Sequence, residues 1–178
     1  HGGTMEDNHE EVIEGFEELR KEGLIRYYGI SSIRPNVIQS FASQSNIISV
    51  MMQYSLLDRR PEEWLSILKE HQISMIARGP IAKGILTEKT LEKSSISIQE
   101  NGFLDYSYNQ LESLLLSLKD HFSTQRSIQE VAFQYILSCD VVGSVIPGAS
   151  NAAPVIDNIK PVQAKPLTDE ELQFLRSI

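Results

Sequence analysis

Short apolar runs alternate strictly with stretches of helical periodicity, and this alternation limits the possible folds more than any other feature of the chain. The apolar runs cover residues 24–30, 47–52, 73–77 and 141–146. After each run, apolar residues recur every three or four positions, as on one face of a helix. Near-continuous apolar strands separated by helices are typical of a parallel sheet covered by helices. We therefore expect an α/β fold with about four parallel strands.

Capping signals indicate where several of the helices begin and end. Asp7-x-x-Glu10, Ser127-x-x-Glu130 and Thr168-x-x-Glu171 have the spacing of capping boxes, while Gly23 supplies a stop and Pro35 a first helical residue. Further helices are expected from Pro61, around Leu111–Leu118 and near Asn151–Pro154. The inward-facing residues expected on the first two helices are Val12, Ile13, Phe16, Leu19, Val37, Ile38 and Phe41.

Two architectures fit this alternation, a doubly wound open sheet and a TIM barrel, and periodicity alone does not choose between them. A TIM barrel has eight strands, so four strands would make half of one, with open edges that must be paired or covered. No internal repeat or linker divides the chain, so we expect one domain over residues 1–178. The chain starts at His1 without an initiator Met, and we interpret this start as a cut.

Composition argues against several partners. Acidic residues outnumber basic ones by 24 to 16, giving a net charge of −8, whereas nucleic-acid binding depends on clustered Lys and Arg. The single cysteine, Cys139, forms no internal disulfide, and the four histidines never approach it at metal-ligand spacing, so no metal is expected. No apolar run has the roughly 20 residues needed to cross a bilayer. We expect no nucleic-acid or membrane partner and a cytoplasmic location.

Ligands of parallel α/β folds bind at the carboxyl ends of the strands, so the residues directly after each apolar run are the candidates for a site. The small-residue loops at 78–84 and 147–151 can hold a phosphate through backbone N–H groups, or their glycines merely permit tight turns. Gln53 can offer an amide to a planar carboxamide or be an ordinary strand end. Ser31 and Ser32 can bind a ligand or cap the helix that begins near Pro35.

Six ordered segments together decide between these alternatives: "HGGT", "LRKEGLIRYYGISSI", "MMQYSLLDRR", "IARGPIAKGILT", "VIPGASNAAPVIDNI" and "LTDEEL". They resemble the second half of aldo-keto reductases, most closely the bacterial branch, over nearly the whole chain. The resemblance implies the C-terminal half of a TIM (β/α)8 barrel, with the last four strands present. It also implies an extended NAD(P)H across the strand ends and hydride transfer to a carbonyl carbon.

The family's catalytic residues are a Tyr, a Lys, an Asp and a His, of which the Tyr protonates the carbonyl oxygen and the His helps to orient the carbonyl. By the resemblance only His1 matches one of these positions, and the other three would precede it. Tyr27, Tyr28 and Tyr54 match no catalytic motif. The chain alone is therefore expected to be nearly inactive.

The resemblance also assigns the cofactor site. Ser31, Ser32 and Gln53 match positions that bind the nicotinamide carboxamide, and Arg78 stands where many members place a stacking aromatic ring. The pyrophosphate-side loop corresponds to Gly79, Pro80, Ile81, Lys83 and Gly84, and the adenosine end to Gly148, Ala149, Ser150, Asp157 and Asn158. Gly148 stands where a Lys often follows the Pro of the last strand, and Pro154 stands where an Arg often holds the NADP 2′-phosphate. We expect NADP first, with NAD possible.

We thus expect an NAD(P)H-dependent oxidoreductase that reduces aldehydes or ketones, with a small carbonyl compound as substrate. One alternative is a nicotinamide-nucleotide-binding or redox-sensing module without catalysis. Another is an unrelated phosphate-binding α/β domain that shares only the strand and loop pattern. The sequence does not define the oligomeric state, although open strand edges predict that the chain by itself associates or partly unfolds.

Overall fold

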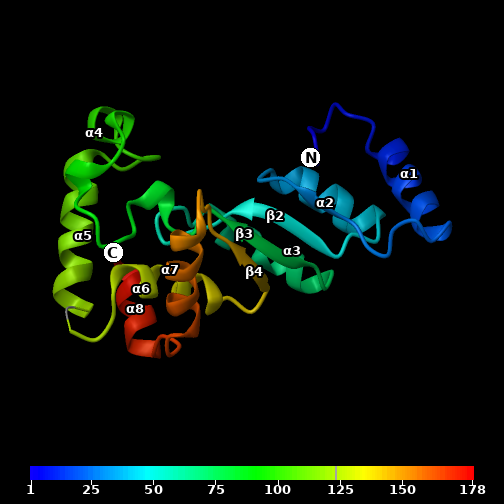
Figure 1. Cartoon of the computed structure of the whole chain (residues 1–178). Coiled ribbons are helices and arrows are strands. Elements are labelled where there is room, and N and C mark those ends of the chain that lie inside the picture. Colours follow the sequence, from blue (N-terminus) through cyan, green and yellow to red (C-terminus); the bar gives the residue numbers. More distant parts are fainter. Residues whose placement is uncertain (123) are drawn as a thin grey trace. The chain divides into compact units, whose positions relative to one another are not determined.

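The computed structural model of the protein describes residues 1–122 and 124–178, which form two compact units (Figure 1). The first unit comprises residues 1–54, 59–78 and 140–146 and contains the whole sheet. The second comprises residues 55–58, 79–139 and 147–178 and is helical. The single domain expected over residues 1–178 stays a prediction.

Four parallel strands form one sheet in the order β1-β2-β3-β4, as the alternation of apolar runs predicted. They are β1 (Gly29–Ser31), β2 (Ser49–Gln53), β3 (Ser74–Arg78) and β4 (Val142–Ile146). Three of the predicted strands differ from the observed bounds by only one or two residues. The first differs more, since the run from residue 24 pairs with β2 only near its end, where Ile48 N donates to Tyr28 O at 3.0 Å. As an edge strand, it has a partner on only one side among the described residues.

The first unit also holds α1 (His9–Lys21), α2 (Pro35–Gln44), the 3-10 turn η1 (Arg60–Trp64) and α3 (Leu65–Glu70). Pro35 is the first residue of α2, and Val37, Ile38 and Phe41 are buried, as predicted. The helix expected from Pro61 begins as a 3-10 turn and becomes α-helical only at Leu65.

Helix α1 differs from the prediction in its cap and in its buried face. Asn8, not Asp7, is the N-cap and accepts from Glu11 N at 3.3 Å, because the Asp7 carboxylate is taken by Thr4. Gly23 follows the helix with φ of +75°, so the predicted stop is confirmed. Of the four expected inward residues only Ile13 is buried, and the stripe of Val12, Phe16 and Leu19 remains 42%, 39% and 37% exposed.

One face of the sheet is buried more deeply than the other. Val50, Met52, Met75 and Ala77 have no exposed surface, and they alternate with the half-buried residues of β2 and β3. This period of two matches the alternation of side chains across a strand. The sequence predicted burial on both faces, because apolar Met51 and Ile76 fill the half-buried positions. The second face is therefore the open one within the first unit.

The second unit consists of helices and turns. They are η2 (Ala82–Gly84), η3 (Leu91–Lys93), α4 (Ile96–Asn101), α5 (Tyr108–Phe122), α6 (Ile128–Leu137), α7 (Ala152–Gln163) and α8 (Asp169–Ser177). The stretch around residues 87–105, expected to be irregular, thus contains η3 and α4. Two of the three predicted capping boxes are confirmed, at Ser127 for α6 and at Thr168 for α8. None of the helices in the described parts of the chain is long and apolar enough to span a membrane.

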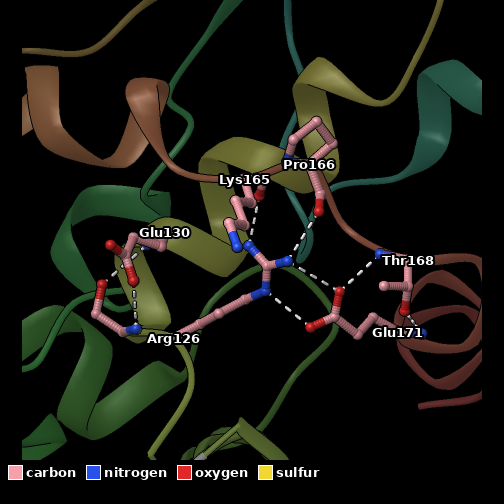
Figure 2. Close-up of polar contacts among 7 residues, drawn as sticks. Arg126, Glu130, Lys165, Pro166, Thr168 and Glu171 are labelled. Carbon is pink, nitrogen blue, oxygen red and sulfur yellow. Dashed lines mark hydrogen bonds and ion pairs between the residues drawn. The ribbon is translucent and has the colours of Figure 1, made fainter.

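Arg126 ties the start of α6 to the segment that leads into α8 (Figure 2). Its guanidinium donates to both carboxylate oxygens of Glu171, at 2.8 and 3.1 Å, and to the carbonyl oxygens of Lys165 and Pro166, at 2.5 and 2.8 Å. Glu171 in turn accepts from Thr168 N at 2.6 Å, inside its capping box. A bidentate Arg–carboxylate pair has a strong directional preference, so these contacts fix the position of the start of α8 relative to the start of α6.

The Arg126–Glu171 pair is largely buried, with 11% and 12% of the two side chains exposed. Burial raises the pKa of the Glu171 carboxyl, but the hydrogen bonds from Arg126 and Thr168 outweigh burial and leave that pKa below its usual value. A carboxyl with a lowered pKa in the folded state adds stability above its unfolded pKa and loses it as pH falls through the folded pKa.

We predict that Glu171→Gln destabilises the protein at neutral pH and that this difference shrinks as pH falls below about 4. Removing one partner of a buried pair typically costs about 3–5 kcal/mol, and a neutral amide retains part of the cap. Urea unfolding of both proteins between pH 7 and pH 3 measures the effect. Asp140→Asn is the matched control, because Asp140 pairs with Lys69 on the surface, with about two-thirds of each side chain exposed. A Glu171→Gln difference that is constant across this pH range would contradict the prediction.

Candidate functional site

The pairing register places three predicted site residues on the same face of the sheet. Gln53 pairs with Arg78, Arg78 pairs with Ile146, and Ser31 pairs with Met51, two residues before Gln53. Because side chains alternate along a strand, Ser31, Gln53 and Arg78 all belong to the open face rather than the buried one. Each is the last residue of its strand. The sequence therefore predicted correctly that these side chains gather at the carboxyl edge of the sheet.

Ser32 is buried directly beyond β1 and is held by two hydrogen bonds. Its N–H donates to Met51 O at 3.1 Å, and its hydroxyl oxygen accepts from Arg34 N at 3.1 Å. The alternative that Ser31 or Ser32 caps α2 is wrong, since Arg34 occupies the N-cap without any side-chain cap bond. The Ser32 hydroxyl still has a proton to donate, so this short turn leaves it able to bind a ligand acceptor.

His1 lies next to β1 because the following residue, Gly2, is hydrogen-bonded to that strand. Gly2 N donates to Ser31 O at 3.0 Å, which places the N-terminal segment along the carboxyl end of β1. A Cβ at Gly2 would lie 3.0 Å from Val37 Cγ1 and 3.3 Å from Ser32 Cβ, so only glycine fits without displacing its neighbours. The structure thus brings the backbone beside His1 to the same edge as Ser31, Gln53 and Arg78.

The loop after β3, in the second unit, has a strained backbone. Gly79, Ala82, Lys83 and Gly84 all have positive φ, of 70°, 46°, 57° and 92°. The amides of Ala82, Gly84, Ile85 and Leu86 are bonded to carbonyls within the loop. These four N–H groups are thus committed within the loop, although the sequence suggested that backbone amides would hold a phosphate here. Pro80 is buried and Ile81 half-buried, so both support the loop rather than face solvent.

Side chains supply the positive charge of this region instead. Lys83, Lys89 and Lys93 line one small hollow of about 120 Å³ together with Ser94, and no acidic residue lines it. The Ser94 hydroxyl oxygen is buried without a hydrogen-bond partner among the described residues. A buried polar atom that lacks a partner is rare and points to a missing ligand or water. The hollow, which we name the lysine hollow, suits a phosphate in size and charge.

Sequence reasoning identified only Lys83 of these three lysines. Lys89, Lys93 and Ser94 lie in the polar stretch that the sequence marked as irregular, where no motif or periodicity distinguished them. One signal was present, because three lysines within eleven residues are unusual in a chain with a net charge of −8. The turn η3, which includes Lys93, brings them to one place.

The predicted adenosine-end residues divide into exposed and buried positions. Gly148, Ala149, Ser150 and Asp157 are exposed, at the start of α7 or on its surface. Asn158 is buried, and its side-chain oxygen accepts from Gln129 Nε2 on α6 at 2.9 Å. Asn158 therefore contributes to the packing of α7 on α6, and only its amide N–H₂ remains for another partner. The assignment of these residues to a cofactor stays a prediction.

Two charged side chains, Asp7 and Arg34, form hydrogen bonds with residues of the N-terminal segment. Hydrogen bonds from the backbone and hydroxyl of Thr4 lower the pKa of the Asp7 carboxyl, with smaller electrostatic contributions from His9 and Arg34. Arg34 itself donates to Gly3 O at 3.1 Å. Nowhere in residues 1–122 and 124–178 do three or more His, Cys, Asp or Glu side chains cluster as metal ligands would.

Comparison with known proteins gives concordant matches. The profile of the Aldo/keto reductase family matches residues 3–178. The chain is 53% identical over 177 residues to the uncharacterized oxidoreductase YqkF of Bacillus subtilis, covering 99% of this chain and 58% of that protein. It thus spans under three-fifths of the length of this relative.

Solved structures agree with the sequence comparison. The aldo-keto reductase AKR11C1 from Bacillus halodurans superposes in its apo form with a TM-score of 0.90 at 49% identity, over 99% of this chain and 59% of that chain. Its holo form gives a TM-score of 0.88 at 48% identity, over 99% and 58%. The four strands and their helices correspond to part of a (β/α)8 barrel, so the expected fold class is confirmed.

We predict that Gly84→Ala destabilises the chain while Gly148→Ala does not. A Cβ meets open space at both positions, so the backbone conformation alone distinguishes them. Gly84 has φ of +92°, where an L side chain costs about 1–2 kcal/mol, whereas Gly148 has no positive φ. Urea unfolding of the two variants beside the parent chain measures the difference. Equal midpoints for both variants would show that the loop does not need its left-handed residue.

Proposed function

The chain belongs to the aldo/keto reductase family, and we propose that it forms the cofactor-binding part of an NAD(P)H-dependent oxidoreductase that reduces aldehydes or ketones to alcohols. The observation that carries this proposal furthest is the lysine hollow, because it offers charge for the phosphates of a dinucleotide within an acidic chain. The proposed substrate is a small carbonyl compound. When bound, the cofactor would supply the hydride that adds to the carbonyl carbon.

The carboxyl edge of the sheet suits the nicotinamide end of the cofactor. A carboxamide has one oxygen acceptor and two N–H donors, and Gln53 and the Ser31 and Ser32 hydroxyls can complement both. Their positions at the strand ends agree with the usual location of ligands in parallel α/β folds. Arg78, at the end of β3, presents a planar guanidinium that can stack on an aromatic ring.

The lysine hollow suits a phosphate group rather than a whole nucleotide. Its volume of about 120 Å³ equals that of about four water molecules, far below the roughly 300–1,000 Å³ of pockets that enclose drug-sized ligands. Three ammonium groups attract a dianionic phosphate, and because all three lysines are exposed, salt screens this attraction. The unsatisfied Ser94 hydroxyl would gain a phosphate oxygen as its partner. We therefore assign Lys83, Lys89 and Lys93 to the phosphates of the proposed cofactor.

NADP is the first choice of cofactor and NAD the second. The exposed residues Gly148, Ala149 and Ser150 at the start of α7 are proposed to contact the adenosine end, together with Asp157. Gly148 and Pro154 carry no charge for a 2′-phosphate, which leaves NAD open. Measuring both affinities distinguishes the two cofactors.

We propose that His1 is the residue that this chain contributes to catalysis. An imidazole beside the strand ends can donate a hydrogen bond to the carbonyl oxygen and so orient the carbonyl for hydride transfer. The Tyr that protonates this oxygen in the family matches no position from His1 onward. The alternative function is a nicotinamide-nucleotide-binding or redox-sensing module without catalysis, which would require no proton donor.

We predict that NADPH binds the purified chain and that Gln53→Ala weakens binding about tenfold, because an unmade hydrogen bond to a buried amide costs about 1–3 kcal/mol. Reduced-nicotinamide fluorescence measures the affinity, and a parallel NADH titration gives the cofactor preference. Gln44→Ala, at the end of α2, is the control with the same substitution elsewhere. Unchanged affinity in Gln53→Ala would contradict the assignment of Gln53 to the nicotinamide carboxamide.

We predict that replacing Lys83, Lys89 and Lys93 together by Gln weakens NADPH binding at least tenfold and flattens its salt dependence, since fewer charges are neutralised. Lys21→Gln, at the exposed end of α1, controls for the loss of one positive charge elsewhere on the chain. Competition by pyrophosphate isolates the phosphate contacts from the nicotinamide contacts. If the triple variant bound NADPH and pyrophosphate like the parent chain, the lysine hollow would not be the phosphate site.

We predict that the 178-residue chain alone oxidises NADPH with aldehydes no faster than its His1→Ala variant. General acid catalysis is worth about 10²- to 10⁴-fold, and this chain offers no match to the catalytic Tyr. Absorbance at the reduced-nicotinamide band measures turnover. Activity above the His1→Ala background would show that the chain supplies a proton donor of its own and would exclude the purely binding module.

A further inference from the structure

His9 is a buried histidine that neither the family resemblance nor the proposed chemistry uses. It is the first residue of α1, and only 8% of it is exposed. Its ring lies 4.7 Å from the ring of Phe41 on α2, at an interplanar angle of 45°. Both ring nitrogens are engaged, with Nε2 2.7 Å from Thr4 O and Nδ1 3.1 Å from the Ser40 hydroxyl oxygen. His9 therefore links the N-terminal segment, α1 and α2.

The hydrogen bond to Thr4 O shows which ring nitrogen of His9 carries a proton. A carbonyl oxygen only accepts, so His9 Nε2 carries a proton and donates to Thr4 O, while Nδ1 shares a hydrogen bond with the Ser40 hydroxyl. Neither nitrogen is then available to a substrate. Together with the burial of the ring, this excludes His9 as a group that touches the reacting carbonyl.

Three successive residues of the N-terminal segment are held in place by their backbone groups. Gly2 N donates to Ser31 O at 3.0 Å, Gly3 O accepts from Arg34 Nη1 at 3.1 Å, and Thr4 O accepts from His9. Thr4 N also donates to the Asp7 carboxylate at 2.5 Å. Of these contacts only the one from His9 comes from a side chain that is itself buried and wedged between two helices. The exposed Arg34 and Asp7 have more conformational freedom.

We propose that His9 is a positioning residue, which clamps Thr4 and thereby holds His1 at the carboxyl edge of β1. The proposal rests on the proposed function for the role of His1, but the clamp itself does not. A group that orients a carbonyl must keep its position within tenths of an ångström, and a packed residue that bonds to the same segment restrains that position. The packed His9 ring provides that support two residues beyond the Gly2–Ser31 bond.

Hydrogen exchange of the Gly2 amide, followed by NMR of the whole chain, tests the clamp directly. His9→Phe keeps an aromatic ring against Phe41 but removes both hydrogen bonds, and we expect at least tenfold loss of Gly2 protection with unchanged protection of β2 and β3. His9→Gln places an amide N–H near the position of Nε2, and we expect it to restore most of the protection. Ser40→Ala, which leaves the ring packing intact, is expected to give a smaller loss. If His9→Phe does not fold, the partial loss of protection expected in Ser40→Ala decides the question.

The link to His1 is tested by its imidazole signals during an NADPH titration. We expect NADPH to shift the Ser31 and Ser32 amide signals in the parent chain and in His9→Phe, and to shift the His1 ring signals only in the parent chain and His9→Gln. Gly2 protection that survives in His9→Phe and Ser40→Ala would overturn the clamp. If Ser31 and Ser32 fail to respond in the parent chain, the proposed function fails while the exchange result still decides the clamp. A His1 response that persists in His9→Phe would overturn the positioning role.

Discussion

Backbone pairing in a parallel sheet decides which side chains share a face, and the proposed nicotinamide site depends on this register. Pairing of Ser31 with Met51 and of Gln53 with Arg78 leaves Ser31, Gln53 and Arg78 on the open face, while Val50 and Met75 fill the other. A shift of one residue would exchange the two faces and bury the polar groups. The apolar residues of the buried face therefore hold the register that the site requires.

Some features of this fold follow from local sequence, because the interactions that form them are local. The capping boxes at Ser127 and Thr168 join a hydroxyl and a carboxylate three residues apart, so the sequence contains both partners. Asp7 has the same spacing to Glu10, yet Thr4 captures its carboxylate and Asn8 becomes the cap. Competition between two nearby donors cannot be resolved from spacing alone, so the cap predicted at Asp7 is wrong.

Burial and charge clustering depend on tertiary structure and were harder to predict. Helical periodicity identified the stripe of Val12, Phe16 and Leu19 but not how far other residues cover it, and although Phe16 stacks on Tyr28 the stripe stays partly exposed. The lysine hollow is likewise a tertiary feature, since the turns after β3 bring Lys83, Lys89 and Lys93 together. The strand ends were predictable because a parallel sheet always aligns its carboxyl edges, whatever the loops do.

The loop after β3 pays for the position of its lysine side chain with backbone strain. Ala82 and Lys83 are consecutive non-glycine residues with positive φ, each of which costs about 1 kcal/mol or more. Such strain persists only where other contacts outweigh it, and Ala82, Ile85 and Leu86 are buried while their amides bond within the loop. The buried residues thus hold the backbone in a conformation that stability alone does not favour. What this conformation provides is the position of Lys83, whose exposed side chain lines the lysine hollow. The strain is therefore best understood as a cost of placing a charge where the phosphates of the proposed cofactor would bind.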